Sequence, residues 1–320
     1  MTSTTSQATT DFVLPEDTLE RFRERAVTYD RENRFFAEDL EELRELGYLR
    51  AALPRAHGGL GISLHQLNLE QRRLAAFAPA TALGVNMHLY WTGPLADQLN
   101  AGNKELLWLA EEIVAGKVIA AGHGEPGNDL VIDDSTTIAT PVDGGYRITG
   151  HKIFTSLSPA WDWLGVHARD NSDPDNPKIV HTFVRRDEIG VSTVETWDTL
   201  SVRATASHDT LLDDVFVPSE RTVGVHAVGE PPTGYVAGIF PWVLPLLGNI
   251  YLGIGRRALD LAIASATSRT ALSLGGESVA QKPFTQYHVA EAEFALEGTQ
   301  GQLDRLTTQL TAGEDLGDRA

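Results

Sequence analysis

Residues 144–156 read GGYRITGHKIFTS, and this stretch decides the fold. Residues 146–155 form a run rich in β-branched and aromatic side chains, which is typical of a strand. Asp143-Gly144-Gly145, at the start of this run, is a signal for a tight hairpin turn, because glycine tolerates the positive φ that such turns need. The stretch therefore predicts the second strand of a β-hairpin.

Similar short runs, separated by turns, lie on both sides of this strand. Together they predict an antiparallel, β-barrel-like domain over residues 119–228. The other runs that we expect to be strands are residues 136–140, 179–184, 191–194 and 210–217. In the central strand, alternation places Ile153 and Thr155 on one face and Phe154 and Ser156 on the other.

Helical patterns precede this β-domain. Residues 12–118 repeat apolar side chains at helical spacing and predict an N-terminal α-helical domain. One helix is expected over residues 36–46 and should end at Gly47, since glycine favours the left-handed conformation that closes a helix. Asn103 is the expected N-cap of the last helix. The other expected helices cover residues 63–78, 80–99 and 103–115, and residues 1–11 are interpreted as a disordered tail.

Helical patterns return in residues 229–320. We expect one long helical segment over residues 235–273, a break at Gly275-Gly276 and a second helix over residues 284–310. Two long helices seldom bury all their apolar faces alone. The C-terminal domain is therefore expected to be an incomplete helical bundle that lacks its last helices or pairs with another subunit. The fold class is α+β, in the order helical domain, β-domain, helical bundle.

Composition excludes several classes of function. The 320 residues include no cysteine, which excludes thiolate metal sites and cysteine nucleophiles, and we expect no metal. A net charge of −18 makes nucleic acid a poor partner. Residues 231–255 carry no charge and form a long apolar run, but prolines at 241 and 245 interrupt it, so we interpret it as a buried bundle helix and expect no membrane span. With no targeting signal apparent, a cytoplasmic location is expected.

Four motifs together resemble the acyl-CoA dehydrogenase family. They are GHGEPGND at 122–129, the strand at 144–156, WDTLSVRATASHD at 197–209 followed by VFVP at 215–218, and GIGRRALD at 253–260. The resemblance covers residues 15–310, and the domain order agrees with it. It extends to flavin monooxygenases of the same fold, of the dibenzothiophene monooxygenase and nitroso-synthase type.

The resemblance implies a flavin site made by two segments of the β-domain. In the loop at 122–129, backbone N–H groups of His123 and Gly124 would face the pyrimidine edge of the flavin, with Asn128 in the same loop. The family often carries a hydroxyl where Gly124 stands, so that contact is absent here. Phe154 would lie against the ring, followed by Thr155, and the Ser156 hydroxyl would lie near N5.

The resemblance also implies a nucleotide contact and a substrate cavity. Arg269 would reach the pyrophosphate of a neighbouring subunit's FAD, with Gln286 near the same nucleotide. The residues expected around the substrate are Met87, His88, Tyr90, Val243 and Leu244. Because several of these are large, a short or unusual substrate is expected. His88 is either a candidate catalytic residue or an interior histidine whose ring nitrogens are hydrogen-bonded.

A family dehydrogenase needs a glutamate base, and neither expected position holds one. One position matches Val243, and the other lies beyond residue 320. Three readings follow. The chain is an FAD-dependent acyl-CoA dehydrogenase whose base lies in a missing C-terminal segment, a monooxygenase that uses reduced FMN and O₂, or a non-catalytic flavin-binding relative. The partners implied are acyl-CoA, an electron acceptor or flavin reductase, and further copies of the chain in a dimer or tetramer.

Overall fold

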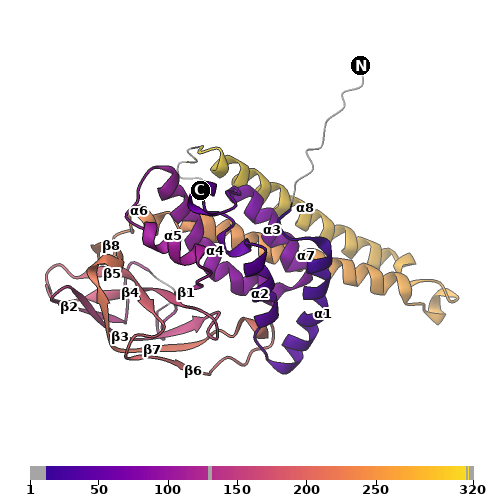
Figure 1. The fold of residues 1–320 in the computed structure, drawn as a ribbon. Helices are drawn as coiled ribbons and strands as arrows, with labels where there is room; N and C mark the ends of the chain where they lie inside the picture. Colours follow the sequence, from indigo (N-terminus) through magenta and orange to yellow (C-terminus); the bar gives the residue numbers. More distant parts are fainter. Residues whose placement is uncertain (1–11, 129–131, 315, 317–320) are drawn as a thin grey trace, which may run out of the picture.

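The computed structural model describes residues 12–128, 132–314 and 316, which form a helical region, a sheet and a pair of long helices (Figure 1). The first region contains five α-helices. They are α1 (Glu16–Glu32), α2 (Ala37–Glu45), α3 (Leu64–Phe77), α4 (Pro79–Asn100) and α5 (Leu107–Val114), with 3-10 turns at Tyr48–Arg50 and Arg55–His57. The expected end of the second helix is confirmed, since Gly47 has φ 74° and its N–H donates to the Arg44 carbonyl. Asn103 is not the N-cap of α5, which begins after Leu106.

The central region is an eight-stranded sheet in which β6, β7, β3, β2, β4, β5 and β8 lie in that order, while β1 pairs with β4. The strands are β1 (Ile119–Gly122), β2 (Ile138–Val142), β3 (Gly145–Thr155), β4 (Trp163–Asp170), β5 (Lys178–Arg185), β6 (Val191–Val194), β7 (His208–Pro218) and β8 (Thr222–Ala227). Two features correct the sequence prediction. The sheet is open rather than closed, and both β1 and β2 pair with β4 in parallel.

The hairpin predicted from residues 143–145 is present. β2 and β3 pair in antiparallel register and are joined by Asp143 and Gly144, which has φ 78°. The predicted face alternation at the end of β3 is wrong. Phe154 has φ 58°, and the pairing of β3 with β7 shifts between Lys152 and Thr155. As a result, Thr155 and Ser156 are both buried, whereas Phe154 is exposed.

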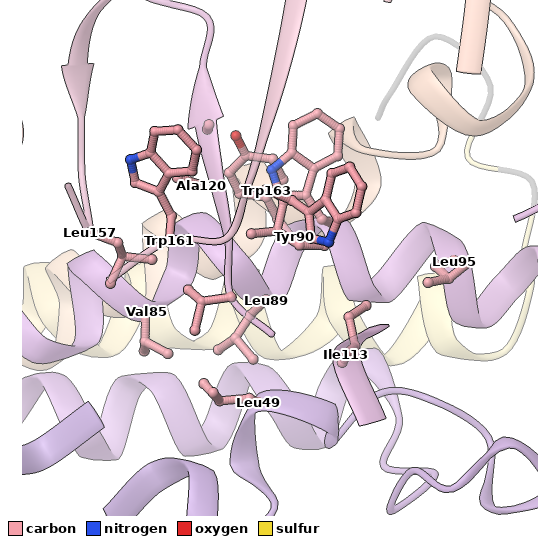
Figure 2. Close-up of a cluster of buried hydrophobic side chains, with 14 of the residues drawn as sticks. Leu49, Val85, Leu89, Tyr90, Leu95, Ile113, Ala120, Leu157, Trp161 and Trp163 are labelled. Carbon is pink, nitrogen blue, oxygen red and sulfur yellow. The ribbon is translucent and has the colours of Figure 1, made fainter. Parts of the chain in front are cut away.

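Helix α4 is the centre of the molecule and is buried along most of its length. A helix that is apolar on all sides needs neighbours on all sides. The Trp91 side chain of α4 packs against Gly165 of the sheet, and Gly93 of the same helix lies against Trp242 of the C-terminal region. Figure 2 shows Val85, Leu89 and other α4 side chains between Leu49 of the helical region and tryptophans that come from the sheet region. The helix therefore connects the helical region, the sheet and the C-terminal helices in one core.

The C-terminal region is formed by the short α6 (Gly234–Ala237), α7 (Phe240–Ser268) and α8 (Pro283–Thr311). The far ends of α7 and α8 extend beyond the rest of the molecule as an arm (Figure 1). Taken together, α6 and α7 (residues 234–268) are long and apolar enough to cross a membrane. In their most apolar stretch of 18 residues, 44% is buried inside the molecule. The expected helix is thus only partly buried in this chain. Its first half packs on α4 and on α3, where Asn249 donates a hydrogen bond to Asn68 (2.8 Å).

Candidate active site

The loop after β1 lies directly against the end of β3. The Ile153 N–H donates to the Gly124 carbonyl at 2.9 Å. A Cβ atom at Gly124 would stand 2.7 Å from the Ile153 carbonyl oxygen, so only glycine allows this close approach. The structure therefore brings His123 and Gly124 next to the Phe154–Ser156 segment, as the resemblance implies.

The buried carboxylate of Glu125 fixes the shape of this loop. It forms a buried ion pair with Lys152 of β3 (Oε1 to Nζ, 2.6 Å). It also accepts hydrogen bonds from the Ser135 hydroxyl (2.7 Å), the Asn128 amide (2.7 Å) and the Thr137 N–H (3.0 Å). A buried carboxylate with this many donors is fully satisfied, which makes the loop rigid. Asn128 thus supports the loop from within it.

Burial and pairing have opposite effects on the two partners. Burial alone would raise the pKa of Glu125, but the Lys152 ammonium and the surrounding donors outweigh it and hold this pKa well below its usual range. Burial lowers the pKa of Lys152 to about 8, against the opposing influence of Glu125. Both groups are therefore charged at pH 7. No sequence motif predicted this pair, because its members lie 27 positions apart on separate segments.

The His123 side chain begins a row of four histidines. Its ring centroid lies 5.4 Å from that of Trp91 and 5.6 Å from that of His167 on β4. The row continues to His181 on β5 (6.0 Å) and His226 on β8 (5.1 Å). Burial, and then the nearby Lys152 charge, lower the pKa of His123 to about 4, so its ring is neutral at pH 7.

Phe154 and Ser156 differ in burial: the Phe154 side chain is exposed to solvent, whereas Ser156 is buried. The Phe154 side chain is 56% exposed, and its ring lies nearly perpendicular to that of Trp197, with the two centroids 6.1 Å apart. Thr155 is buried and accepts a hydrogen bond from the Thr210 hydroxyl (3.2 Å). The Ser156 hydroxyl lies 2.8 Å from that of Ser207. An uncovered aromatic ring beside a hydroxyl is an arrangement that can stack on and hydrogen-bond to a planar ligand.

His88 has a structural role in this geometry. The Ile119 N–H donates to its Nδ1 (3.0 Å), so the proton of a neutral ring is on Nε2 and is donated to the Leu49 carbonyl (2.7 Å). Burial lowers its pKa to about 4. Because both ring nitrogens are engaged and the side chain is fully buried, His88 has no free nitrogen with which to take a proton from substrate. These contacts favour the interior-histidine reading over the catalytic one.

The other expected cavity residues are not enclosed together. Tyr90 is buried, Met87 and Val243 are partly buried against the core, and Leu244 is 62% exposed. A cavity of about 730 Å³ lies elsewhere, between α3, the end of α4, the start of α7 and the end of α8. Its lining includes Asp97 and Trp242, whose indole N–H donates to the Asp97 carboxylate at 2.8 Å.

Arg269 and Gln286 lie near the tip of the arm, away from the loop at 122–128 (Figure 1). Arg269 follows the last residue of α7, and its side chain is exposed. The Gln286 side chain donates to the Ala280 carbonyl (3.0 Å). Within one chain, neither residue is brought to the 122–128 loop or the 154–156 segment.

The comparisons with known proteins agree with this architecture. Residues 16–106 match the family model of the acyl-CoA dehydrogenase N-terminal domain, and residues 246–319 match that of the C-terminal domain. The chain is 32% identical over 282 residues to YdbM of Bacillus subtilis (strain 168), a protein named only provisionally as an acyl-CoA dehydrogenase. This match covers 87% of this chain and 71% of YdbM. The chain belongs to the acyl-CoA dehydrogenase family.

Other relatives carry out different reactions on the same fold. The chain is 26% identical to the L-evernosamine nitrososynthase of a Micromonospora species, covering 81% of this chain and 60% of that protein. The solved structure of KijD3 with FMN and a dTDP-linked amino sugar has a TM-score of 0.77 at 25% identity and covers 95% of this chain and 73% of that one. Butyryl-CoA dehydrogenase from Megasphaera elsdenii has a TM-score of 0.78 at 20% identity, with 95% and 82% covered, which shows the shared fold.

Proposed function

We propose that this chain is a flavin-dependent oxidoreductase that binds its flavin between the 122–128 loop and the 154–156 segment. The close approach of Gly124 to Ile153, beside the exposed Phe154 ring, carries this proposal. The residues fit the cofactor, because a Gly124 side chain would fill the space between the two segments and the polar groups nearby are backbone amides and a hydroxyl. FAD is the proposed cofactor for a dehydrogenase, and FMN for a monooxygenase.

The proposed reaction is the α,β-dehydrogenation of an acyl-CoA thioester. The flavin, when bound, would supply the acceptor for the β-hydride, and the reaction would also need a base for the α-proton, which neither Val243 nor Leu244 can supply. The chain's own residues would hold the ligand: Phe154 would stack on it and Ser156 would donate a hydrogen bond to it, while Glu125 keeps the loop in position through its buried contacts. Support for this reaction comes from both family models and from YdbM.

A reduced-flavin monooxygenase is the second candidate. Val243 and Leu244 favour it, because these apolar side chains of α7 stand where a dehydrogenase would carry its base. The first carboxylate along α7 is that of Asp260, 17 positions after Val243. A monooxygenase needs no base for an α-proton. The nitrososynthase relative and the FMN in the KijD3 structure support the same reading.

Anaerobic absorbance spectroscopy separates the two candidates. The flavin-loaded protein is titrated with acyl-CoAs of different length and branching, and the flavin maximum is followed. Bleaching without O₂ is the result expected of a dehydrogenase, with an electron acceptor needed to restore the colour. No bleaching, together with product formation only when reduced flavin and O₂ are supplied, would replace this reading with the monooxygenase. Flavin binding with neither response would identify a non-catalytic relative.

We also propose that the chain forms a homo-oligomer through its arm. Large apolar side chains are exposed along the arm and near its tip, including Leu261, Leu272, Phe284, Tyr287 and Phe294. Exposed apolar surface of this kind is typical of protein interfaces. Light scattering coupled to gel filtration tests the proposal, and a monomer at micromolar concentration would contradict it.

A further inference from the structure

Two segments of the β-domain with unusual backbone geometry face one another beside Ser156. Among the described residues, six that are not glycine have positive φ, and four of them lie in these segments. They are Phe154 (58°), Leu157 (65°), Val202 (49°) and Ala206 (44°). A β-branched residue such as Val202 rarely adopts this conformation. Strained residues persist where surrounding structure fixes them, and they gather at functional sites.

Backbone hydrogen bonds and burial hold the two segments together. The Leu157 N–H donates to the Thr205 carbonyl (3.0 Å), and the Ser158 N–H donates to the Ala206 carbonyl (3.3 Å). The Leu157 side chain is fully buried in the hydrophobic core, on the α4 side of the sheet region (Figure 2). The two residues that follow Ser156 are therefore held against residues 205–206.

Three buried hydroxyls form a chain between these segments. The Ser156 and Ser207 oxygens are 2.8 Å apart, and the Ser207 and Thr205 oxygens are 2.7 Å apart. Thr205 is 1% exposed, Ser207 is 4% exposed and Ser156 is 8% exposed. Each hydroxyl has one proton to donate. The accessible surface is thus largest at the Ser156 end of the chain.

The direction of these hydrogen bonds follows from the burial of Thr205. Ser207 is the hydrogen-bonding partner of the Thr205 hydroxyl, and a buried hydroxyl donates its proton where it can. If Thr205 donates to Ser207, the buried Ser207 proton finds an acceptor within this chain of hydroxyls only by being donated to Ser156. The Ser156 proton then has no acceptor in this chain of hydroxyls and is left for a ligand.

We propose that Ser207 and Thr205 are positioning residues that aim the Ser156 hydroxyl proton at the bound flavin. This inference rests on the proposed function and extends it, since it assigns the donor direction at Ser156 to residues in a separate segment. Neither Ser207 nor Thr205 needs to touch the ligand. Their effect on it passes through Ser156 alone.

Flavin titration of the full chain, followed by absorbance and fluorescence, tests the proposal. Ser207→Ala and Ser156→Ala should each weaken flavin binding by about three- to tenfold, the range of one net hydrogen bond. Both should shift the flavin absorbance maximum in the same direction. The double variant should bind no more weakly than Ser156→Ala, because Ser207 acts only through Ser156.

Thr205 provides a second, isosteric test. Thr205→Val removes the hydroxyl and keeps the shape, so it should reproduce the weaker binding, whereas Thr205→Ser should retain wild-type affinity. The matched control is Thr182→Val on β5, where a buried threonine hydroxyl donates to the Arg221 carbonyl (3.0 Å) away from the site. This control should leave flavin binding unchanged. Melting curves of all variants establish that they fold.

Different results would contradict the positioning role of Ser207 and Thr205 and the proposed flavin-dependent function. If Thr205→Val and Ser207→Ala bind flavin as the Thr182→Val control does, or if their effects add to that of Ser156→Ala, the positioning role is wrong and the flavin site stands. If the wild-type chain binds neither FAD nor FMN, the proposed function fails and the positioning role fails with it.

Discussion

The buried carboxylate of Glu125 shows how a single residue can shape a site without touching a ligand. Five donors surround it, and one of them, Lys152, is itself fully buried. Removing two charges from water costs much free energy. The ion pair and its hydrogen bonds offset this cost only when both partners are present. The loop at 122–128 is therefore stable only as long as this pair is intact.

Removing one partner of the pair should be strongly destabilising. Lys152→Met leaves the Glu125 carboxylate buried without its cation, and we expect it to lower the free energy of unfolding by about 3–5 kcal/mol. The control is Lys117→Met, whose ammonium pairs with Asp162 (2.9 Å) at the surface, where such a pair contributes about 0–1 kcal/mol. Urea denaturation measures both. Equal effects in the two variants would contradict the role of the buried pair.

The buried histidines make the stability of the fold depend on pH. Burial lowers the pKa of His88 and His123 to about 4 and that of His181 to about 3, and it also lowers the pKa of His167. Unfolded histidines bind protons near pH 6.5, so the unfolded state takes up more protons than the folded state below that pH. Stability should therefore fall as the pH decreases from about 7 toward 4. Asp39, whose pKa is raised to about 6 by burial, offsets part of this loss.

His167→Leu tests the sign of this dependence. His167 is fully buried, and its ring nitrogens have no hydrogen-bond partner among the described residues. The substitution should reduce the change in unfolding free energy between pH 6 and pH 5 by about 1.4 kcal/mol, the equivalent of one proton. His288→Leu, on the exposed surface of α8, is the control. A dependence as steep in His167→Leu as in the wild type would contradict the prediction.

At the scale of elements, the contact between α4 and α7 is one of those that join the C-terminal helices to the core, together with the packing of α3 on α7 and α8. A Cβ atom at Gly93 would lie 2.0 Å from the Trp242 ring. Gly93→Ala should therefore lower the melting temperature by several degrees, since overpacking costs about 1–3 kcal/mol. Gly301→Ala on α8, where nothing lies within 4 Å, should instead raise it slightly through helix propensity. Calorimetry measures both, and a neutral Gly93→Ala would rule out this close contact.

Sequence patterns predicted best the elements in which apolar and polar residues recur with the period of a helix or a strand. β6 matches its expected range, and α8 (Pro283–Thr311) differs from the expected helix by one residue at each end. β4 was not among the runs identified by alternation, because the strand is buried on both faces and so lacks alternation. The positive φ of Leu157 occurs where its N–H donates to the Thr205 carbonyl, 48 positions further along the chain. Such long-range contacts leave no local signal.

The same distinction holds for the candidate site. The two segments of the proposed flavin site were predicted from motifs, and the structure brings them together through Gly124 and Ile153. The Glu125–Lys152 pair and the row of histidines were not predicted. Their members come from separate strands, and only the register of the sheet places His167 opposite His181. His88 was ambiguous because a single buried histidine gives no sign in the sequence of where its nitrogens point.

At the scale of the whole molecule, the arm sets where Arg269 would lie in the proposed oligomer. Arg269 lies near the tip of the arm, away from the site of its own chain (Figure 1). In the proposed oligomer, its guanidinium would contact the pyrophosphate of FAD in a neighbouring subunit. FMN has no pyrophosphate.

Arg269→Ala should therefore weaken FAD binding by about tenfold or more, consistent with the loss of a charge-assisted hydrogen bond, and leave FMN binding unchanged. Fluorescence titration with both flavins measures this, and gel filtration establishes that the variant keeps its oligomeric state. Equal losses for FAD and FMN would place Arg269 in a structural role instead.

The central claim is that the two segments joined at Gly124 and Ile153 form a flavin site. The most direct measurement is an equilibrium titration of the full chain with FAD and FMN, comparing the wild type with Gly124→Ala. We predict saturable binding of one flavin per chain in the wild type and its loss in Gly124→Ala, while circular dichroism shows that the variant remains folded. Binding that is unaffected by Gly124→Ala, or no saturable binding of either flavin by the wild type, would contradict the account.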